Sequence, residues 1–290
     1  MAEKQVFALL YDFDKTLSPK DMQEYAFISD VGMEPSEFWA RCGHTEKSNN
    51  MDQILAYMYV MKEQAQGKFP LTREKLMAQG KNVKLFNGVQ TWFKRVNDYI
   101  ISKGMIPEHY IISSGIKEII EGTAIGHEFK KIYAAEFMYD ENGEACWPAM
   151  AVNYTSKTQF MFRVNKGILP VTQNVELNTY MPESERRVPF TNMIYLGDGI
   201  TDVPCMKLAR VNGGHSIAVY QNEEQKAKVN ELIVQGRVDF VRKADYSKGS
   251  GLEKTVFAII DKVHADHILA SMHNKSFDKA QKEMLQVEEE

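Results

Sequence analysis

Two aspartates separated by one residue follow an apolar run near the start of the chain. Asp12 and Asp14 come directly after residues 6–10, which are all apolar. Carboxylates this close repel each other unless a cation or a shared proton relieves the repulsion. The pair therefore indicates a cation site or an acid/base pair, or more simply a strand that ends in a polar loop with Asp14 as a cap. The triplet by itself does not decide among these.

Polar residues follow two other short apolar runs in the same way. One run ends in the tripeptide Ser113-Ser114-Gly115. Another ends in the segment GDGITD, which contains Asp198 and Asp202. Three or four carboxylates without an accompanying His or Cys form an oxygen ligand set that suits Mg²⁺, which usually also contacts a phosphate. The serine hydroxyl and the backbone N–H groups at a helix start suit phosphate oxygens.

A cation is also expected beside a bound phosphate, and Lys157 is the candidate. It lies in the first turn of a predicted helix that is capped by Thr155 or Ser156. A lysine at this end of a helix is unfavourable for the helix dipole, which favours a functional reason for its presence. Lys166 is the competing lysine, and Lys157 is preferred because of its position at the helix start.

The elements that must position these residues are short strands and helices. The runs 6–11, 110–112 and 193–196 are apolar on both faces, which predicts strands of a parallel sheet covered by helices. Helical patterns lie between and after them, at 89–100, 116–121 and 203–209. Ligands of open α/β sheets bind beyond the carboxyl ends of the strands, so the polar residues are expected to converge on one crevice.

Two further segments stand apart from this pattern. The chain between the first and second predicted strands carries helical patterns at 22–28, 36–41, 51–66 and 72–79. Residues 132–152 contain two alternating runs around Asn142-Gly143, which predicts a hairpin.

The composition is that of an ordinary globular protein, with 44% hydrophobic residues, 26% charged residues and a formal net charge of −4. No basic stretch is dense enough to indicate a nucleic-acid partner or an anionic membrane, and no apolar run is long enough to span a bilayer. The amino terminus lacks the basic-then-apolar order of a signal peptide. Scattered Cys42, Cys146 and Cys205 argue against a disulfide framework or a zinc site. These features predict a cytoplasmic protein.

The order of the chemical residues resembles the motif order of the haloacid dehalogenase superfamily. Residues 12–16 match its D-x-D-x-T motif, Ser113 its second motif, Lys157 its third and residues 197–202 its G-D-x-x-x-D motif. The likeness extends over about the whole chain and is nearest to the phosphoserine-phosphatase-like branch. The chain departs from that branch at Ser114, where Gly is frequent, and in a longer stretch between the third and fourth motifs.

The resemblance implies a Rossmann-like, doubly wound parallel sheet and Mg²⁺-dependent phosphoryl transfer through an aspartyl-phosphate. Asp12 would be the nucleophile and a metal ligand. Asp14 would be the general acid and base, and its backbone carbonyl would bind the metal. Asp198 would complete the ligands and Asp202 would support the site, so the predicted metal set is Asp12, Asp14, Asp198 and Asp202.

The phosphate-binding set implied by the resemblance is Ser113, Ser114, Gly115 and Lys157, of which Ser113 and Lys157 also act in catalysis. Within the superfamily, dehalogenases lack an acid at the position of Asp14, whereas phosphatases carry Asp there to protonate the leaving alcohol. Phosphatase activity is therefore the prediction.

The superfamily likeness also places a helical cap domain between the first and second motifs. The expected division is an α/β core of residues 1–18 and 87–290, with a hairpin insert at about 132–152, and a small, mainly helical cap of residues 19–86.

The sequence thus predicts a Mg²⁺-dependent phosphatase that hydrolyses a small phosphorylated metabolite. A phosphotransferase with the same aspartyl-phosphate and a catalytically idle anion-binding protein on the same fold are the alternatives. The identity of the phosphomonoester, the oligomeric state and the role of residues 168–190 do not follow from the sequence.

Overall fold

The protein is built on one sheet, seen in a computed structural model that describes residues 5–289. Residues 1–4 of the predicted core lie outside the described residues. The strands are β1 (Val6–Tyr11), β2 (Ile106–Ile116), β3 (Lys131–Tyr139), β4 (Ala145–Met150), β5 (Met193–Gly197), β6 (His215–Tyr220) and β7 (Phe240–Lys243). Their spatial order is β4-β3-β2-β1-β5-β6-β7, and every neighbouring pair is parallel except β3 with β4. Without β4 this is the 3-2-1-4-5-6 order of a doubly wound Rossmann-like sheet, which confirms the predicted fold class.

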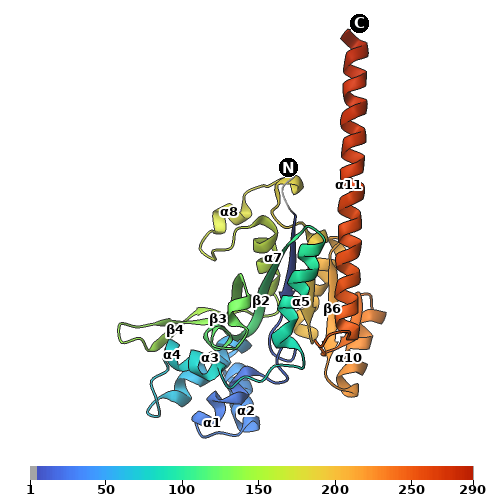
Figure 1. Ribbon diagram of the computed structural model, residues 1–290. Helices are drawn as coiled ribbons and strands as arrows, with labels where there is room; N and C mark the ends of the chain where they lie inside the picture. The colour runs from blue at the N-terminus through green and yellow to red at the C-terminus, as the bar shows by residue number, and fades with distance from the viewer. Residues whose placement is uncertain (1–4, 290) are drawn as a thin grey trace.

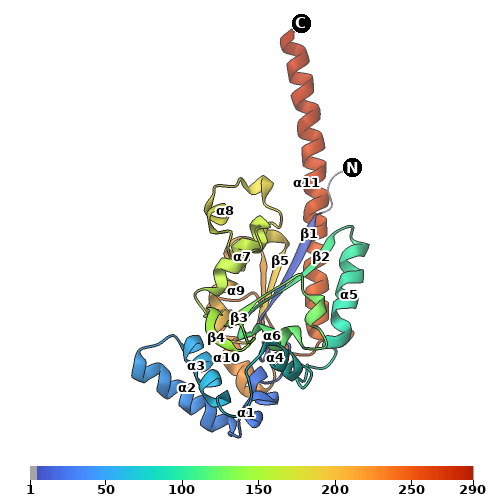
Figure 2. The same ribbon diagram turned by 90° about the vertical axis from the view of Figure 1, so that its left-hand side faces the viewer.

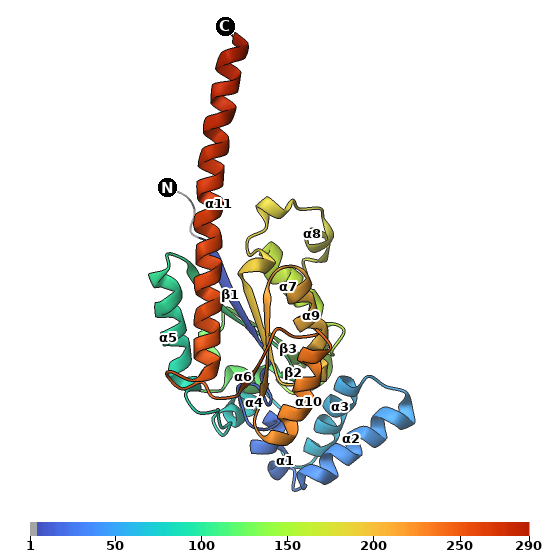
Figure 3. The ribbon, with the colours of Figure 1, turned by 90° about the vertical axis from the view of Figure 1, so that its right-hand side faces the viewer.

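Helices cover both faces of the sheet (Figures 2 and 3). On one face lie α5 (Val89–Ser102) and α11 (Gly251–Glu289), and on the other lie α7 (Lys157–Lys166), α9 (Val203–Val211) and α10 (Glu223–Val234). Alternate side chains of β1 belong to two different hydrophobic cores. Leu9 lies in one core and Leu10 lies in the other. All of β1 is buried, as expected for the central strand of a sheet covered on both sides.

The insert between β1 and β2 lies at the carboxyl end of β1 (Figure 1). Its helices are η1 (Met22–Tyr25), α1 (Phe27–Asp30), α2 (Pro35–Asn49), α3 (Gln53–Ala65) and α4 (Arg73–Gly80). Each predicted helical segment contains a helix, although the first is split in two and the second continues further than predicted. Side-chain caps define two of the starts: Asp52 accepts from the N–H groups of Ile54 and Leu55, and Thr72 accepts from that of Lys75.

The last helix of the insert, α4, packs against α6 (Lys117–Glu121) at backbone distance. A Cβ atom added to Gly80 would lie 2.2 Å from the carbonyl oxygen of Ile119, and one added to Gly122 would lie 1.9 Å from that of Met77. Arg73 also forms ion pairs with carboxylates of α6 and β3. Whatever part of residues 19–86 acts as a cap, α4 is attached to the core.

The second strand is longer than predicted. β2 continues past residue 112 to Ile116, and its register against β3 shifts between Ile112, opposite Tyr133, and Ile116, opposite Ala135. Residues 113–115 therefore form a bulge, a feature that frequently re-aims groups beside active sites. The polar tripeptide was expected to end the strand, but pairing resumes after it.

The predicted hairpin is present, with Gly143 at φ 79° in its turn. Its first strand, β3, pairs in parallel with β2, so it belongs to the main sheet and only β4 is an addition. The N–H of Ala145 donates to the carbonyl oxygen of Leu71 at 2.8 Å, which joins the hairpin to the insert.

The segment 168–190, whose role the sequence left open, lies at the opposite end of the sheet from the insert (Figure 1). It contains the short helix α8 (Asn174–Asn178). Buried Arg163 of α7 holds it by donating to the carbonyl oxygen of Pro170 at 2.7 Å. This segment therefore lies away from the carboxyl ends of the strands.

The carboxy-terminal helix, α11, packs on the sheet at its start and then projects from the body (Figure 1). Val256 and Ile260 are fully buried, whereas residues 268–285 are exposed. Among the described helices, none is both long and apolar enough to cross a membrane.

Glu108 of β2 is a buried carboxylate that ties the end of the 168–190 segment to the sheet. It pairs with Arg187 and Lys130, and accepts a hydrogen bond from the hydroxyl of Tyr110 at 2.5 Å. Burial by itself raises the pKa of Glu108, but these donors outweigh it and lower the pKa from 4.5 to about 2.

We expect Glu108→Gln to lower the free energy of unfolding at neutral pH by about 2 kcal/mol, because the buried donors lose their charged acceptor. Since the folded-state pKa lies below the unfolded value, the carboxylate's contribution is complete above 4.5 and is lost as the pH falls towards about 2. Urea unfolding of both proteins at neutral pH and near pH 3 measures the effect. The difference should shrink at the lower pH, and an unchanged difference would contradict this account. Glu231→Gln, on the exposed face of α10, is the control and should be neutral at both pH values.

Candidate active site

The carboxyl end of β1 is the centre of the site. β1 lies between β2 and β5, where the strand order of a doubly wound sheet reverses and where such folds bind ligands. The N–H of Asp12 donates to the carbonyl oxygen of Leu196 at 2.9 Å, which fixes Asp12 to the neighbouring strand. Carboxylate oxygens of Asp12, Asp198 and Asp202 all lie within 4.8 Å of one another. The fold thus brings together three of the four predicted metal residues.

Lys157 is the cation of this cluster. Its Nζ atom lies 3.1 Å from Oδ1 of Asp12 and 2.7 Å from Oδ1 of Asp202, and its side chain is 1% exposed. Burial lowers the pKa of Lys157, but the two carboxylates outweigh burial and raise the pKa, so the ammonium keeps its proton. Lys166, the competing lysine, instead donates to the carbonyl oxygens of Leu177 and Thr179.

The start of α7 places Lys157 at the helix end as predicted, but the cap differs. Oδ1 of Asn153 accepts from the N–H groups of Thr155 and Ser156 at 3.1 and 2.9 Å. Ser156, one of the two predicted residues, is the N-cap by position, but its hydroxyl accepts no bond from the first turn of α7 and instead donates to the carbonyl oxygen of Asn153 at 3.2 Å. The amide of Asn153 also donates to Asp52 at the start of α3, at 2.9 Å.

Asp202 has no exposed surface and uses both of its oxygens within the protein. Oδ1 accepts from Lys157 and from the hydroxyl of Tyr195, each at 2.7 Å, and Oδ2 accepts from the N–H of Asp198 at 3.2 Å. A Cβ atom added to Gly197 would lie 2.5 Å from this carboxylate. We infer that Asp202 positions Lys157 and the backbone of Asp198, rather than binding a metal directly.

The cluster is short of positive charge. Burial raises the pKa of Asp12 to about 6, with Lys157 opposing the rise and Asp202 adding to it. Burial, Asp202 and Asp12 together raise the pKa of Asp198 well above its usual range. One ammonium does not neutralise three carboxylates, so a bound cation is favoured. Oxygen donors without a His or Cys fit Mg²⁺.

Asp14 is held from the side of the insert. Its Oδ1 atom accepts from the N–H of Met22, at the start of η1, at 2.9 Å. Burial, with the charges of Asp21 and Asp12, raises the pKa of Asp14 well above its usual range. A raised pKa favours the protonated form of the carboxyl group, which is the form that a general acid needs.

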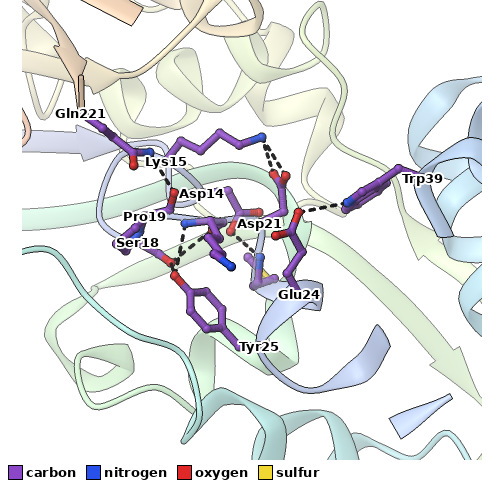
Figure 4. A network of polar contacts seen from close by, with 11 residues as sticks. Asp14, Lys15, Ser18, Pro19, Asp21, Glu24, Tyr25, Trp39 and Gln221 are labelled. Atoms are coloured by element: carbon purple, nitrogen blue, oxygen red, sulfur yellow. Dashed lines mark hydrogen bonds and ion pairs between the residues drawn. The ribbon is translucent and has the colours of Figure 1, made fainter. Parts of the chain in front are cut away.

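The turn that carries Asp14 is tight and contains a strained residue. The carbonyl oxygen of Phe13 accepts from the N–H groups of residues 16–18. Lys15 has a φ of 59°, which is uncommon outside glycine and frequent at functional sites. Its ammonium pairs with Asp21 at 2.7 Å (Figure 4), so the turn is joined to the entry of the insert.

The second motif lies against the first. Ser113 is 1% exposed, and its Oγ atom accepts from the N–H of Gly115 at 3.1 Å. A Cβ atom added to Gly115 would lie 2.1 Å from Cε of Met22 and 3.0 Å from Oδ2 of Asp14. A side chain at position 115 would therefore displace the end of the Met22 side chain and crowd the carboxyl group of Asp14. Ser114, which departs from the pattern of the phosphoserine-phosphatase-like branch, is partly exposed.

Sequence reasoning missed Met22, Tyr57 and Tyr195, although each contacts a motif residue. Tyr57 lies in the predicted helical segment 51–66, and its hydroxyl donates to the carbonyl oxygen of Ser114 at 2.6 Å. The available signal in the sequence was a tyrosine within a buried stretch, because a buried tyrosine hydroxyl needs a hydrogen-bond partner. The sequence pattern does not say which partner that is.

The sequence profile of the haloacid dehalogenase-like hydrolases matches residues 9–207. Because this match covers more than half of the chain, the protein belongs to that family. The match begins within β1 and ends within α9, so it includes all four motifs.

A relative over nearly the full length is an uncharacterized protein of Borreliella burgdorferi. The two sequences are 27% identical over an alignment 281 residues long. The alignment covers 86% of this chain and 94% of the relative.

Two solved structures share the fold. A haloacid dehalogenase family hydrolase from Salmonella enterica serovar Typhi has a TM-score of 0.53 at 16% identity, covering 89% of this chain and 72% of its own. A probable phosphoserine phosphatase from Vibrio cholerae has a TM-score of 0.55 at 10% identity, covering 89% and 66%. At these identities the likeness establishes the architecture alone.

We expect Gly197→Ala to reduce the free energy of unfolding by about 1–3 kcal/mol, because the new methyl group overlaps the buried carboxylate of Asp202. Gly43→Ala is the matched control: nothing lies within 4 Å of its added Cβ in α2, and alanine should stabilise that helix. Thermal unfolding of the two variants and the wild type measures this. If Gly197→Ala were as stable as Gly43→Ala, the close packing of Asp202 on Gly197 would be wrong.

Proposed function

We propose that this protein is a Mg²⁺-dependent phosphatase that hydrolyses a small phosphomonoester through a phosphoryl group on Asp12. The observation that carries the proposal is the buried carboxylate of Asp12 at 3.1 Å from Nζ of Lys157, with the carboxyl group of Asp14, held by the N–H of Met22, two residues further on. Membership of a hydrolase family supports it. So does the fold shared with the probable phosphoserine phosphatase of Vibrio cholerae.

The arrangement suits two successive displacements at phosphorus. A carboxylate oxygen of Asp12 attacks the phosphorus atom, and the bond from phosphorus to the ester oxygen breaks. Asp14 gives its proton to that oxygen, so the alcohol leaves neutral. Asp14 then accepts a proton from water as the water oxygen attacks phosphorus, which releases inorganic phosphate and restores the carboxylate of Asp12. One difficult step is thereby divided into two easier ones.

The charge of the transferring group must be neutralised, since phosphoryl transfer depends mainly on positioning and electrostatic stabilisation. Lys157 supplies a buried positive charge next to Asp12, and the hydroxyl of Ser113 supplies a donor. Oxygens of Asp12 and Asp198, with the backbone carbonyl of Asp14, would hold Mg²⁺. When bound, the ion supplies further positive charge to the phosphoryl oxygens.

The core groups address only a phosphate and an ester oxygen, which every phosphomonoester offers. Discrimination among substrates is therefore assigned to the insert, whose first residues lie beside Asp14. Figure 4 shows its polar groups there, including Asp21 paired with Lys15 and Glu24 bonded to the indole N–H of Trp39 at 3.1 Å.

We expect Asp12→Asn to reduce phosphate release by roughly a thousandfold or more, because an amide is not a nucleophile. The measurement is phosphate release from a panel of phosphorylated metabolites, with and without Mg²⁺ and with candidate acceptor alcohols. Asp98→Asn, an exposed change on α5, is the control and should retain full activity. Near-wild-type turnover in a folded Asp12→Asn protein, or turnover that survives exhaustive chelation, would overturn the proposal. Phosphoryl transfer to an alcohol in place of water would indicate a phosphotransferase.

We expect Asp14→Asn to slow hydrolysis by roughly a hundredfold or more for an alkyl phosphate, because the leaving alcohol is no longer protonated. An aryl phosphate has a better leaving group, so its first step should lose much less. Single-turnover rates of alcohol and phenol release from the two substrates test this. Equal losses for both would argue against Asp14 as the general acid.

A further inference from the structure

The bulge in β2 turns one peptide group out of the sheet and towards the insert. Residues 113–115 lie between two registers of pairing with β3. The carbonyl oxygen of Ser114 accepts a hydrogen bond from the hydroxyl of Tyr57 on α3 at 2.6 Å, across 57 positions of sequence. Tyr57 is 5% exposed, so water does not compete freely for this contact.

The contact determines the direction of the next backbone N–H. Ser114 C=O and Gly115 N–H belong to the same planar trans peptide group and point in opposite directions. The N–H of Gly115 donates to Oγ of Ser113 at 3.1 Å. Tyr57, this peptide group and the Ser113 hydroxyl therefore form one chain of hydrogen bonds.

Accepting that bond leaves Ser113 with a defined remaining donor. A serine hydroxyl has one proton to donate and two acceptor positions. The N–H of Gly115 occupies one acceptor position of the Ser113 oxygen, and the hydroxyl proton of Ser113 has no acceptor among the described residues, so it is available to a phosphoryl oxygen.

The insert also contacts the chain beside residues 113–115 at a second point. Sδ of Met22 accepts from the N–H of Ile116 at 3.2 Å, while the N–H of Met22 donates to Asp14 at 2.9 Å. Trp39 packs edge-on against the ring of Tyr57, and the two ring centroids lie 6.3 Å apart. This packing restricts the direction of the Tyr57 hydroxyl. Burial and the nearby carboxylate of Asp14 raise the pKa of Tyr57 well above its usual range, so the hydroxyl remains a donor.

We propose that Tyr57 is a positioning residue for phosphoryl binding: it orients the Ser114–Gly115 peptide so that the hydroxyl of Ser113 donates to the substrate. This role rests on the proposed phosphatase function and adds to it a specific route by which the seated insert completes the phosphate site.

The test is a double-mutant cycle of wild type, Tyr57→Phe, Ser113→Ala and the double variant. If Tyr57 acts through Ser113, Tyr57→Phe should lower kcat/KM for the best phosphomonoester by roughly tenfold, and it should add little further loss once Ser113 is already alanine. Tyr59→Phe, on the exposed side of the same helix, is the matched control and should match the wild type. Melting temperatures verify that all the variants are folded.

A second readout keeps this proposal separable from the proposed function. Calorimetric titration of inorganic phosphate in the presence of Mg²⁺ gives the second measurement. Phosphate should bind more weakly to Tyr57→Phe than to the wild type. The affinity of Ser113→Ala for phosphate should equal that of the double variant. Wild-type turnover on the metabolite panel decides the phosphatase function, whereas the cycle decides the role of Tyr57 even if no substrate is turned over. Additive losses, a Tyr57→Phe protein indistinguishable from Tyr59→Phe, or a wild type that does not bind phosphate would overturn it.

Discussion

The structure depends on crowding carboxylates at the carboxyl ends of two neighbouring buried strands, β1 and β5. Asp12, Asp198 and Asp202 bring oxygens within 4.8 Å of one another, and such a cluster is unfavourable unless positive charge is placed within it. Lys157 is shared between two of these carboxylates, which requires α7 to begin at the same point where β1 and β5 end. The parallel topology meets this requirement because the carboxyl ends of its strands lie on one edge.

The strand that carries Asp12 is anchored by a buried polar chain as well as by apolar packing. The hydroxyl of Tyr11 accepts from the indole N–H of Trp92 at 3.0 Å and donates to Nδ1 of His109, 3.1 Å away, while Nε2 of His109 donates to Asn97 at 2.8 Å. Burial lowers the pKa of His109 to about 3, so the ring is neutral and both of its nitrogens are used. Buried polar groups that are all hydrogen-bonded specify one register of the strand, because any shift of the strand leaves these groups unpaired.

The insert is part of the site rather than a cover laid over it. Met22 and Tyr57 contact the first and second motifs directly, whereas α4 is fixed to α6 through the close approach at Gly80 and Gly122. The insert is thus joined to the core at three separate points, at Met22, at Tyr57 and along α4.

The sequence by itself determined the order of the elements and the residues of the four motifs. Apolar runs and helical spacing are local patterns, so they identified β1, the start of α7 and the helices of the insert. Aspartates and a lysine at motif spacing have few structural explanations, which is why the cluster of Asp12, Asp198 and Asp202 around Lys157 could be anticipated.

Only the tertiary structure decided how those residues are held. Four features differ from or add to the local pattern: the bulge at residues 113–115, the turn held by Asn153 before α7, the engagement of both Asp202 oxygens and the bond from Tyr57 to Ser114. Each depends on which distant group arrives at an unsatisfied donor or acceptor, and many partners are compatible with one local sequence. That choice is made by the packing of the sheet and the insert, where a buried polar group without a partner is too costly to persist.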